Sequence, residues 1–336
     1  MKGISVIVCC YNSALRLPET LKHLALQKVS IEIPWEIIVV NNASNDNTVQ
    51  IAIEEWRKYE NKNIKFKVVD ACVAGLSFAR EKGIAESEYG YLIFCDDDNW
   101  FFENYIENAF KLLETWPDAG IIGGYGLPAP AVEPPEWFKN YSSYYATGSQ
   151  NLCNGIIAGN SPGVYGAGAV IRKTALQQLK EINFETIATD RRNEKLSSGG
   201  DIELCFAIKL LGYNVCYSDH LKFHHFIPEN RLSKKYLLAL VYQFGYCDIL
   251  HRPYYWLFNS SLPKYKKTWF WVLMISLNIY LISLINLFKR GNSLARFIHR
   301  INLSHSKGRL TAIIKLNWRI QKYYKLVCQK FKQPIN

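Results

Sequence analysis

The first part of the chain alternates between short apolar runs and segments whose apolar residues recur at helical spacing. The apolar runs, rich in β-branched side chains, cover residues 4–9, 36–40, 66–69 and 91–95. The segments between them are helical in pattern, as Leu17, Leu21 and Leu24 share one face of the first. A second helix includes Trp56, and a third covers residues 75–85. This alternation predicts an α/β fold, with a Rossmann-like, mostly parallel sheet and helices on both faces.

The pattern changes between residues 125 and 165. This stretch is rich in Gly, Tyr and Ser and is interrupted by Pro128, Pro130, Pro134, Pro135 and Pro162. A long irregular segment inside a compact domain is uncommon and is often functional. The alternation then resumes, with a strand expected at 166–171, helices at 173–181 and 201–211, and a last strand at 214–218.

Residues 268–288 carry no charged side chain and are overwhelmingly apolar. The stretch is long enough to cross a bilayer, which takes about 20 residues, although Asn278 and Asn286 interrupt it. Lysines precede it and a basic tail follows it, so a crossing would leave one basic flank outside the cytoplasm. A re-entrant or interfacial segment would keep both flanks on the cytoplasmic face. The alternative is a helix inside a protein core.

The net charge of +11 is concentrated in the tail. Residues 289–336 hold twelve Lys and Arg and no Asp or Glu, which leaves 28 basic and 29 acidic side chains for the rest. Such a tail suggests anionic lipid or nucleic acid as a partner. Its apolar residues recur as in an interfacial helix, namely at Ile313, Leu316, Ile320, Tyr323, Val327 and Phe331. The apolar stretch 268–288, which a nucleic-acid arm does not need, favours lipid, so we expect no nucleic-acid partner.

The cysteines indicate a reducing compartment. There are nine, an odd number, with no CxxC motif, and several lie inside the apolar runs. A buried reduced thiol behaves as a small hydrophobic group, so this distribution argues against structural disulfides and a zinc site. The apolar run at 4–9 is too short for a signal peptide and is better explained as the first strand.

Three aspartates, Asp96, Asp97 and Asp98, directly follow the apolar run 91–95. In a parallel sheet, ligands bind beyond the carboxyl ends of the strands. Carboxylates there suit a hard cation such as Mg²⁺ or Mn²⁺ that also binds substrate phosphates. An acidic surface turn is the simpler alternative. A phosphotransferase, in which a strand-end aspartate attacks phosphate, is a second one, although such enzymes usually use the first strand of the domain.

Five motifs follow one another in a set order along residues 3–230. They are ISVIVCCYN (4–12), EIIVVNNASNDNT (36–48), GLSFAR (75–80), DDD (96–98) and GGDIELC (199–205). In order and spacing they resemble the family 2 glycosyltransferases. The resemblance implies the GT-A fold and transfer of a sugar from a nucleotide-sugar donor, mostly with inversion. It also implies a divalent cofactor, Mn²⁺ or Mg²⁺.

The resemblance assigns residues to the donor and the metal. The donor-binding residues it implies are Cys10, Tyr11, Asn12, Asn41, Asn42, Arg80, Asp96, Asp97 and Arg231, and the metal ligands are Asp98, Asp96 and either His224 or His225. Members of the family often have an Asp pair where this chain has Asn41 and Asn42, so the donor base is not implied. The histidines and Asn42 also have a structural alternative as hydrogen-bonded sheet-edge and turn residues.

Asp201 resembles the catalytic base of the family. Inversion requires a carboxylate on the acceptor side that takes the proton of the attacking hydroxyl. The family usually has Glu before this Asp, where Gly200 stands here. Asp201 also begins a predicted helix, and Asp is favoured there as an N-cap for its own reasons. Acceptor contacts are expected from Gly166, Gly200 and Trp137, whose ring either stacks on a sugar or packs down as part of a lid.

The sequence therefore predicts a metal-dependent inverting glycosyltransferase at the cytoplasmic face of a membrane. Residues 1–230 would form the catalytic domain, with a nucleotide-binding half (1–124) and an acceptor half (125–230), and residues 231–336 a basic, helical, membrane-associated region. The acceptor expected is a lipid-linked or cell-surface glycan, and the tail would contact anionic lipid. The alternatives are a metal-dependent phosphotransferase or nucleotidyltransferase using Asp96–Asp98, and a non-catalytic glycan-binding protein.

Overall fold

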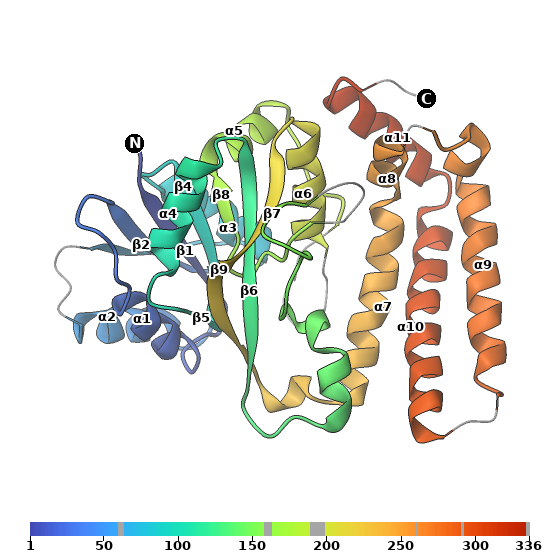
Figure 1. The fold of residues 1–336 in the computed structure, drawn as a ribbon, viewed down its shortest axis with the longest axis horizontal. Helices are drawn as coiled ribbons and strands as arrows, with labels where there is room; N and C mark the ends of the chain where they lie inside the picture. The colour runs from blue at the N-terminus through green and yellow to red at the C-terminus, as the bar shows by residue number, and fades with distance from the viewer. Residues whose placement is uncertain (60–63, 158–162, 189–198, 260, 290–291, 334–336) are drawn as a thin grey trace.

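One mixed sheet forms the centre of the N-terminal part of the molecule (Figure 1). The computed structural model describes residues 1–59, 64–157, 163–188, 199–259, 261–289 and 292–333. The described strands are β1 (Ile4–Cys10), β2 (Trp35–Asn41), β3 (Lys65–Asp70), β4 (Tyr91–Asp96), β5 (Asn99–Phe101), β6 (Ala119–Pro130), β7 (Gly155–Ile156), β8 (Val170–Arg172) and β9 (Asn214–Ile227). They pair in the order β3-β2-β1-β4-β8-β6-β9-β5, and β7 also pairs with β9.

Helices cover both faces of this sheet and continue beyond it. The described helices are α1 (Leu17–Ala25), α2 (Thr48–Arg57), α3 (Leu76–Glu86), α4 (Tyr105–Thr115), α5 (Lys173–Glu181), α6 (Gly200–Leu210), α7 (Lys234–Leu250), α8 (Arg252–Phe258), α9 (Trp269–Asn286), α10 (Ser293–Leu316) and α11 (Arg319–Lys330). Short 3₁₀ turns are η1 (Glu136–Asn140), η2 (Ser142–Tyr145), η3 (Glu229–Arg231) and η4 (Lys264–Lys267). The predicted α/β fold is confirmed.

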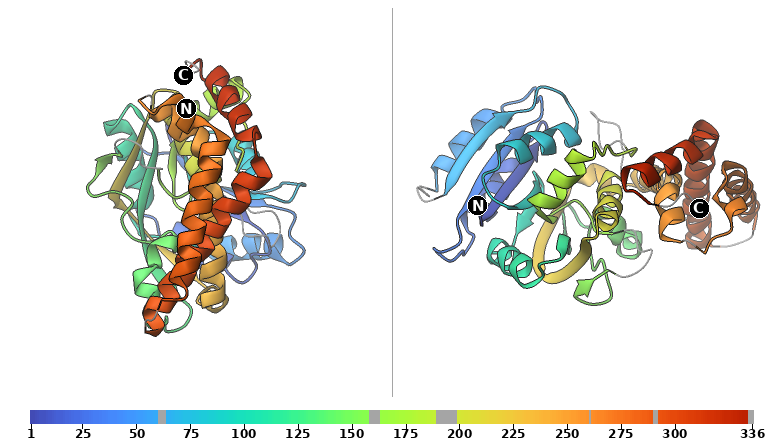
Figure 2. Two further views of the ribbon diagram at one scale, coloured as in Figure 1. Left: turned by 90° about the vertical axis from the view of Figure 1, so that its right-hand side faces the viewer. Right: turned by 90° about the horizontal axis from the view of Figure 1, so that it is seen from above.

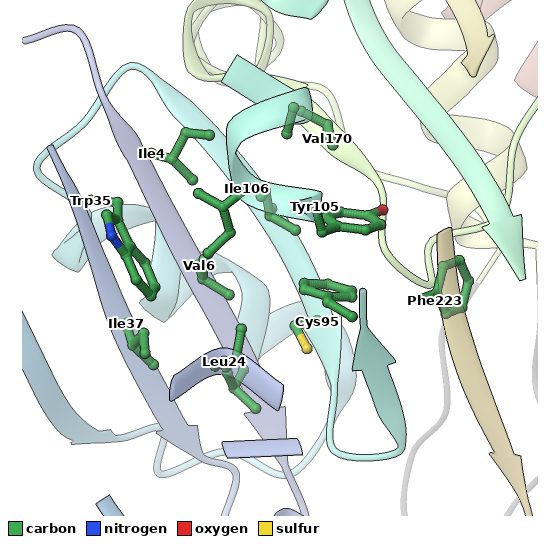
Figure 3. Packing of buried hydrophobic residues seen from close by; sticks show 14 of the residues in the cluster. Ile4, Val6, Leu24, Trp35, Ile37, Cys95, Tyr105, Ile106, Val170 and Phe223 are labelled. Carbon is green, nitrogen blue, oxygen red and sulfur yellow. The ribbon is translucent and has the colours of Figure 1, made fainter. Parts of the chain in front are cut away.

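Alternation along β1 separates two cores. Ile4 and Val6 face a core that includes residues of α1, α2 and α4, whereas Ile7 faces a second core with α3, α5 and α6. Side chains of a strand point alternately to the two faces, so a fully apolar strand is buried on both. Figure 3 shows Ile4 and Val6 beside Trp35 of β2 and Ile106 of α4 in the first core.

The parallel strands β1, β2, β3 and β4 end at the same edge of the sheet. Cys10 pairs with Asn41, Asn41 pairs with Asp70, and Cys9 of β1 pairs with Asp96. Since parallel neighbours run in one direction, their polar exit loops lie side by side at this edge. The sheet therefore brings together the strand-end residues that the sequence assigned to the donor and the metal.

Three of the expected boundaries were wrong. Strand β6 extends into the stretch 125–165, carrying Pro128 and Pro130, and pairs in parallel with β9 as far as Ile227. Proline is tolerated in a strand whose N–H side needs no partner, and β8 pairs with β6 only at Ile121 and Ile122. Part of the stretch, 158–162, lies outside the described residues.

Strand β9 is much longer than the expected 214–218, because polar side chains in its second half hide the apolar pattern. His220, His224 and His225 therefore lie on β9 itself and do not follow it. Conversely, β8 is shorter than the expected 166–171, since Gly168 has a φ of +67°, which is incompatible with an extended strand.

Helices α7 to α11 form a layer beside the part of the molecule that holds the sheet, with α10 between α7 and α9 (Figures 1 and 2). Glycines allow α7 and α10 to approach closely. A Cβ atom at Gly245 would lie 2.0 Å from the His305 carbonyl oxygen, and one at Gly308 would lie 2.0 Å from that of Tyr242. Substitution at either glycine would therefore push the two helices apart.

The predicted interfacial stripe of the tail was wrong. Asn317, with a φ of +42°, separates the tail into α10 and α11. Most of the stripe is buried in protein cores, namely Ile313, Leu316, Ile320, Val327 and Phe331. The pattern was that of an amphipathic helix, but its apolar face packs on protein. The outward apolar surface of this region belongs to α9 instead.

Candidate active site

The three aspartates at the end of β4 have different surroundings. Asp96 ends the strand and is partly exposed, whereas Asp97 and Asp98 are buried in the turn that follows. Asp97 accepts a hydrogen bond from Nε of Arg16 at 3.1 Å, and Thr20 donates to its carbonyl oxygen. Asp97 thus connects this turn to the start of α1, and its predicted donor contact stays a prediction.

Opposing effects act on the pKa of Asp97. Burial raises the pKa of Asp97 to about 6, and the neighbouring charge of Asp98 acts in the same direction. The guanidinium of Arg16 acts against both effects by attraction and by hydrogen bonding. Arg16 therefore stabilises a buried acidic turn at the edge of the sheet where ligands are expected.

Asp98 is surrounded by donors from three elements. Oδ1 accepts from the Asn99 amide at 3.2 Å and lies 3.5 Å from Nε2 of His225, while Nη1 of Arg231 lies 3.4 Å from Oδ2. Its carbonyl oxygen accepts from the Phe226 N–H at 2.9 Å, which ties the turn to β9. The turn, β9 and η3 therefore converge on the carboxylate of Asp98.

His225 is the histidine that faces Asp98. Adjacent side chains of a strand point to opposite faces, and His224 instead contacts the Phe102 ring on the other side of β9. Nδ1 of His225 donates to the carbonyl oxygen of Tyr145 at 2.6 Å, which leaves Nε2 directed at Asp98. Of the two histidines that the sequence left open, His225 therefore has the geometry of a ligand beside Asp98, and the metal ligand itself stays a prediction.

Asp98 and His225 fit a divalent cation that is held only partly by protein. Among the described residues no group of three His, Cys, Asp or Glu side chains is arranged to hold a metal. Mg²⁺ sites of nucleotide-using enzymes commonly take one or two protein ligands, and substrate phosphates and water complete the coordination. Burial lowers the pKa of His225, but the charge and hydrogen bond of Asp98 outweigh it and the net direction is upward. The site therefore attracts positive charge.

The edge of the sheet beside β1, β2 and β3 offers fewer free groups than expected. Cys10 is fully buried with its thiol in the first core, and Asn42 is buried and accepts a hydrogen bond from the Gly75 N–H at 3.1 Å. Both were assigned to the donor, and both serve the fold. Asn41 remains partly exposed and donates to Oδ1 of Asp70 at 2.8 Å.

The turn after β1 completes this edge. Tyr11 is partly exposed and Asn12 is exposed, with a φ of +49° at Asn12. The Asn12 side-chain oxygen accepts from the Asn45 N–H at 2.8 Å, and the main-chain N–H of Asn12 donates to the Ser44 hydroxyl. The two exit loops are therefore fastened to each other, which fixes the floor of a ligand site.

The other acidic group, Asp201, lies in the first turn of α6. Its Oδ2 accepts from the Gly166 N–H at 3.0 Å and its Oδ1 from the Ile202 N–H at 2.8 Å. A Cβ atom built on Gly166 would lie 2.6 Å from Nη2 of Arg80 and 3.3 Å from Cβ of Asp201. Gly166 thus has Arg80 and Asp201 as immediate neighbours, and the guanidinium of Arg80 also lies over the Phe94 ring of β4.

The C-terminal helices hold the start of α6. Nε2 of His251 donates to the carbonyl oxygen of Gly199 at 2.9 Å, and Tyr254 donates to Glu203 at 2.7 Å. Burial lowers the pKa of His251 to about 4, so the ring is neutral near pH 7. Gly200 is buried as the first residue of α6. Residues of α7 and α8 therefore help to position the carboxylate of Asp201.

A match to a known family decides what kind of site this is. The family model described as Glycosyl transferase family 2 matches residues 5–180, which is slightly more than half of the chain. The chain belongs to glycosyl transferase family 2. The predicted family is confirmed, and with it the assignment of this protein to the glycosyltransferases.

Curated relatives share part of their length with this family 2 member. Cholesterol galactosyltransferase of Borreliella burgdorferi is 34% identical over 96 residues, 29% of this chain and 25% of that protein. Poly-beta-1,6-N-acetyl-D-glucosamine synthase of Staphylococcus epidermidis is 36% identical over 129 residues, 37% of this chain and 28% of that protein. Glucosyl-dolichyl phosphate glucuronosyltransferase of Haloferax volcanii is 22% identical over 253 residues, 72% and 75% of the two chains. The chain thus spans only about a quarter of the first two relatives.

Solved structures show the same fold. Staphylococcus aureus TarS 1–349 in complex with UDP-GlcNAc has a TM-score of 0.53 at 15% identity, covering 97% of this chain and 92% of that one. Mannosyltransferase PcManGT of Pyrobaculum calidifontis, in complex with GDP-Man and Mn²⁺, has a TM-score of 0.52 at 14% identity, covering 97% and 74%. At these identities the likeness establishes the GT-A fold.

The aromatic loop of this glycosyltransferase does not present Trp137 as a sugar platform. The Trp137 ring packs against Phe297 of α10, with centroids 6.0 Å apart, and Phe138 and Tyr145 are buried beside them. The structure thus shows the packed arrangement of Trp137, and an acceptor contact of this partly buried ring stays a prediction.

Several residues of the site were missed by sequence reasoning. They are Arg16 beside Asp97, Asp70 beside Asn41, Tyr145 behind His225, and Tyr165, whose pKa is raised to about 12 by burial and by the charge of Asp201. Asp70 ends a strand next to Asn41, and that strand-end position was the available signal. The other three depend on tertiary contacts that no local pattern announces.

Gly166→Ala is expected to lower turnover roughly 100-fold without unfolding the protein, because small misplacements of reacting groups cost about that much. The new methyl group would displace Arg80 or Asp201, as the distances of 2.6 and 3.3 Å require. Steady-state kinetics and thermal melting would measure the two effects. Gly148→Ala, where a methyl group meets nothing within 4 Å, is the matched control for added bulk, although its φ of +85° adds local strain. Normal turnover in Gly166→Ala would refute the tight packing inferred here.

Proposed function

We propose that this protein is a metal-dependent inverting glycosyltransferase that moves a sugar from a nucleotide-sugar donor to a hydroxyl group. The observation that carries the proposal is the pair of separate acidic groups. Asp98, with His225 and Arg231, suits a cation and a diphosphate, whereas Asp201 is held on another element by the Gly166 N–H and suits a proton.

On the donor side, Oδ of Asp98 and Nε2 of His225 would hold Mn²⁺ or Mg²⁺. The cation would offset charge that grows on the leaving diphosphate. Arg231 would bind a diphosphate oxygen, since a guanidinium matches the geometry of phosphate. Asn41 and Asp70 would contact the base or ribose. PcManGT, whose complex contains GDP-Man and Mn²⁺, supports this class of donor and cofactor, and the TarS complex contains UDP-GlcNAc.

On the acceptor side, Asp201 would act as general base. It would take the proton of the acceptor hydroxyl as that oxygen forms a bond to the anomeric carbon, while the bond from that carbon to the diphosphate breaks. The two N–H donors on Asp201 hold its carboxylate in one orientation. Each carboxylate oxygen has a second lone pair, so both contacts are compatible with proton transfer.

We further propose that the enzyme works at the cytoplasmic face of a membrane on a lipid-linked or surface glycan. Among the described residues, α9 is the one helix long and apolar enough to span a bilayer, yet 17% of its residues are buried in the protein. It packs along α10, which carries Arg296 and Arg300. A crossing helix would draw these charges toward the bilayer, at high cost. An α9 that lies in the interface, with anionic lipid near the cations, avoids that cost.

The double substitution Ile282→Asp/Ile285→Asp is expected to weaken vesicle binding at least about 100-fold, since burial of each isoleucine contributes roughly 2 kcal/mol. Both side chains are half exposed or more on α9. Flotation with phosphatidylglycerol vesicles would measure binding, which should also weaken as salt rises. The control, Leu15→Asp/Leu152→Asp, changes two exposed leucines of the catalytic half. Equal flotation of both double variants would contradict the assignment of α9 to the membrane.

The function itself is tested by a donor screen with Mn²⁺ or Mg²⁺, with and without membrane lipid extract. Metal-dependent release of a nucleoside diphosphate or monophosphate together with a new glycoside would support the proposal. Released pyrophosphate or a phosphorylated enzyme would favour the nucleotidyltransferase or phosphotransferase alternatives. Glycan binding with no turnover in any combination would favour the non-catalytic one.

A further inference from the structure

A cavity of about 240 Å³ lies within the C-terminal helices, away from the residues that bind the donor in the proposal above. Four elements enclose it, namely α8, η4, α9 and α10, and the segment after α8 contributes one side chain. Its lining divides into cations (Arg252, Lys266 and Arg309) and apolar side chains (Trp256, Leu262, Trp271, Val272 and Ile275). Charged and apolar groups in one cavity indicate an amphiphilic ligand.

Within the described part of the chain, the cationic side of the cavity has few compensating groups. The Nε atoms of Arg252 and Arg309 are both buried and have no hydrogen-bond partner among the described residues. Arg309 is only 5% exposed, and its ion pair is with Asp248, the same carboxylate that lies 3.9 Å from Arg252. One carboxylate thus serves two guanidinium groups, and Lys266 adds a third cation. Burial lowers the pKa of both arginines.

Unsatisfied buried donors are costly, and each one in a native structure requires an explanation. Guanidinium groups bind phosphate through parallel N–H donors, and a lysine at the rim would add a point charge. The three cations thus have the chemistry to bind a phosphate group inside the cavity. Inorganic phosphate would fill only this side and would leave the apolar lining without a partner.

The apolar side of the cavity leads onto the surface of α9. Val272 is buried, whereas Ile275 is 38% exposed and continues into the outward apolar face of the helix. Lys266 lies over the Trp271 ring, 5.9 Å from its centroid, so the cationic and aromatic groups meet at η4. A chain leaving the cavity past Ile275 would enter the surface that we assign to the membrane.

We propose that this cavity binds a lipid phosphate, with the phosphate on Arg252, Arg309 and Lys266 and the hydrocarbon chain along Val272 and Ile275 of α9. The proposal rests on the membrane contact of α9 but not on sugar transfer. A membrane phospholipid and a polyprenyl-phosphate acceptor share this chemistry. In either case the ligand would fasten α8, α9 and α10 to one another at the membrane surface.

The test is binding of dihexanoyl phosphatidic acid, a soluble short-chain lipid phosphate, to the full-length protein without donor, acceptor or metal. Calorimetry should show saturable binding that Arg252→Gln and Lys266→Gln each weaken about tenfold or more, because each removes a charge-assisted hydrogen bond. Lys307→Gln removes a charge from an exposed position of α10 and is the matched control. If Arg252→Gln lowers the melting temperature of the protein, Lys266→Gln still tests the site, because Lys266 lies on the short η4 turn and not inside an α-helix.

The outcomes separate the possibilities. Saturable binding that depends on Arg252 and Lys266 supports the proposal. If polyprenyl phosphate then competes at a lower concentration than phosphatidylglycerol does, the polyprenyl-phosphate acceptor is the ligand of the cavity. Equal competition would identify a general phospholipid site. Equal binding by wild type, Lys266→Gln and Lys307→Gln, or binding of inorganic phosphate as tight as that of the lipid, would overturn it. Loss of transferase activity would not affect this readout, so the two proposals fail separately.

Discussion

Replacing Asp201 with asparagine is expected to lower kcat about 1,000-fold, because general base catalysis contributes roughly 10² to 10⁴ to such reactions. The amide keeps the size of the side chain and can still accept from one of the two N–H groups that now bind the carboxylate. Binding of the nucleotide-sugar should therefore change less than twofold. Steady-state kinetics for kcat and calorimetry for the donor dissociation constant would separate the two.

Asp118→Asn is the control for this prediction. Asp118 is exposed just before β6, and its recorded contact is through the main chain, where its carbonyl oxygen accepts from the Asn214 N–H. Its replacement should leave kcat unchanged. Suppose that Asp201→Asn kept the wild-type kcat and melting temperature. Asp201 would then serve only as an acidic side chain in the first turn of α6.

Replacing Asp98 with asparagine is expected to weaken binding of Mn²⁺ in the presence of the nucleoside diphosphate by at least about 100-fold. Substitution of a residue that only hydrogen-bonds to a metal ligand already lowers metal affinity 10- to 100-fold, and substitution of a direct ligand should lower it more. Loss of the charge also leaves His225 and Arg231 without the carboxylate that they face. Electron paramagnetic resonance of free Mn²⁺ would measure the affinity.

Two neighbouring histidines provide the matched pair for the metal prediction. His225→Ala should weaken Mn²⁺ binding as Asp98→Asn does, because it removes Nε2 at 3.5 Å from Asp98. His224→Ala should not, because that ring contacts Phe102 on the opposite face of β9. Equal effects of the two histidine variants would contradict the proposed metal site.

The sequence was informative about where functional residues emerge and less so about where their side chains point. Strand ends are visible in the apolar pattern, so Asp98 and Asn41 could be placed at one edge of the sheet, whereas Asp201, in the first turn of α6, was assigned from the family resemblance. Directions within a turn depend on tertiary contacts. Asp97 faces Arg16, and Asn42 faces Gly75, and neither partner is close to it in the chain.

The C-terminal region illustrates a second limit of sequence reasoning. An apolar stripe at helical spacing identifies an amphipathic helix but not what covers it. Ile313 and Ile320 pack on protein, whereas the uniformly apolar α9 is the helix left with an exposed face. Likewise, a tryptophan in a loop is the kind of side chain that stacks on sugars. Only the packing of Trp137 on Phe297 reveals that this ring belongs to a core.

The most direct test of the account is a crystal soaked with nucleotide-sugar and Mn²⁺, recorded at a wavelength where manganese scatters anomalously. The account predicts one strong peak bonded to Asp98 and to Nε2 of His225, with the diphosphate on its far side near Arg231 and the anomeric carbon facing Asp201. A manganese peak and nucleotide away from Asp98, or a donor whose anomeric carbon faces away from Asp201, would contradict it.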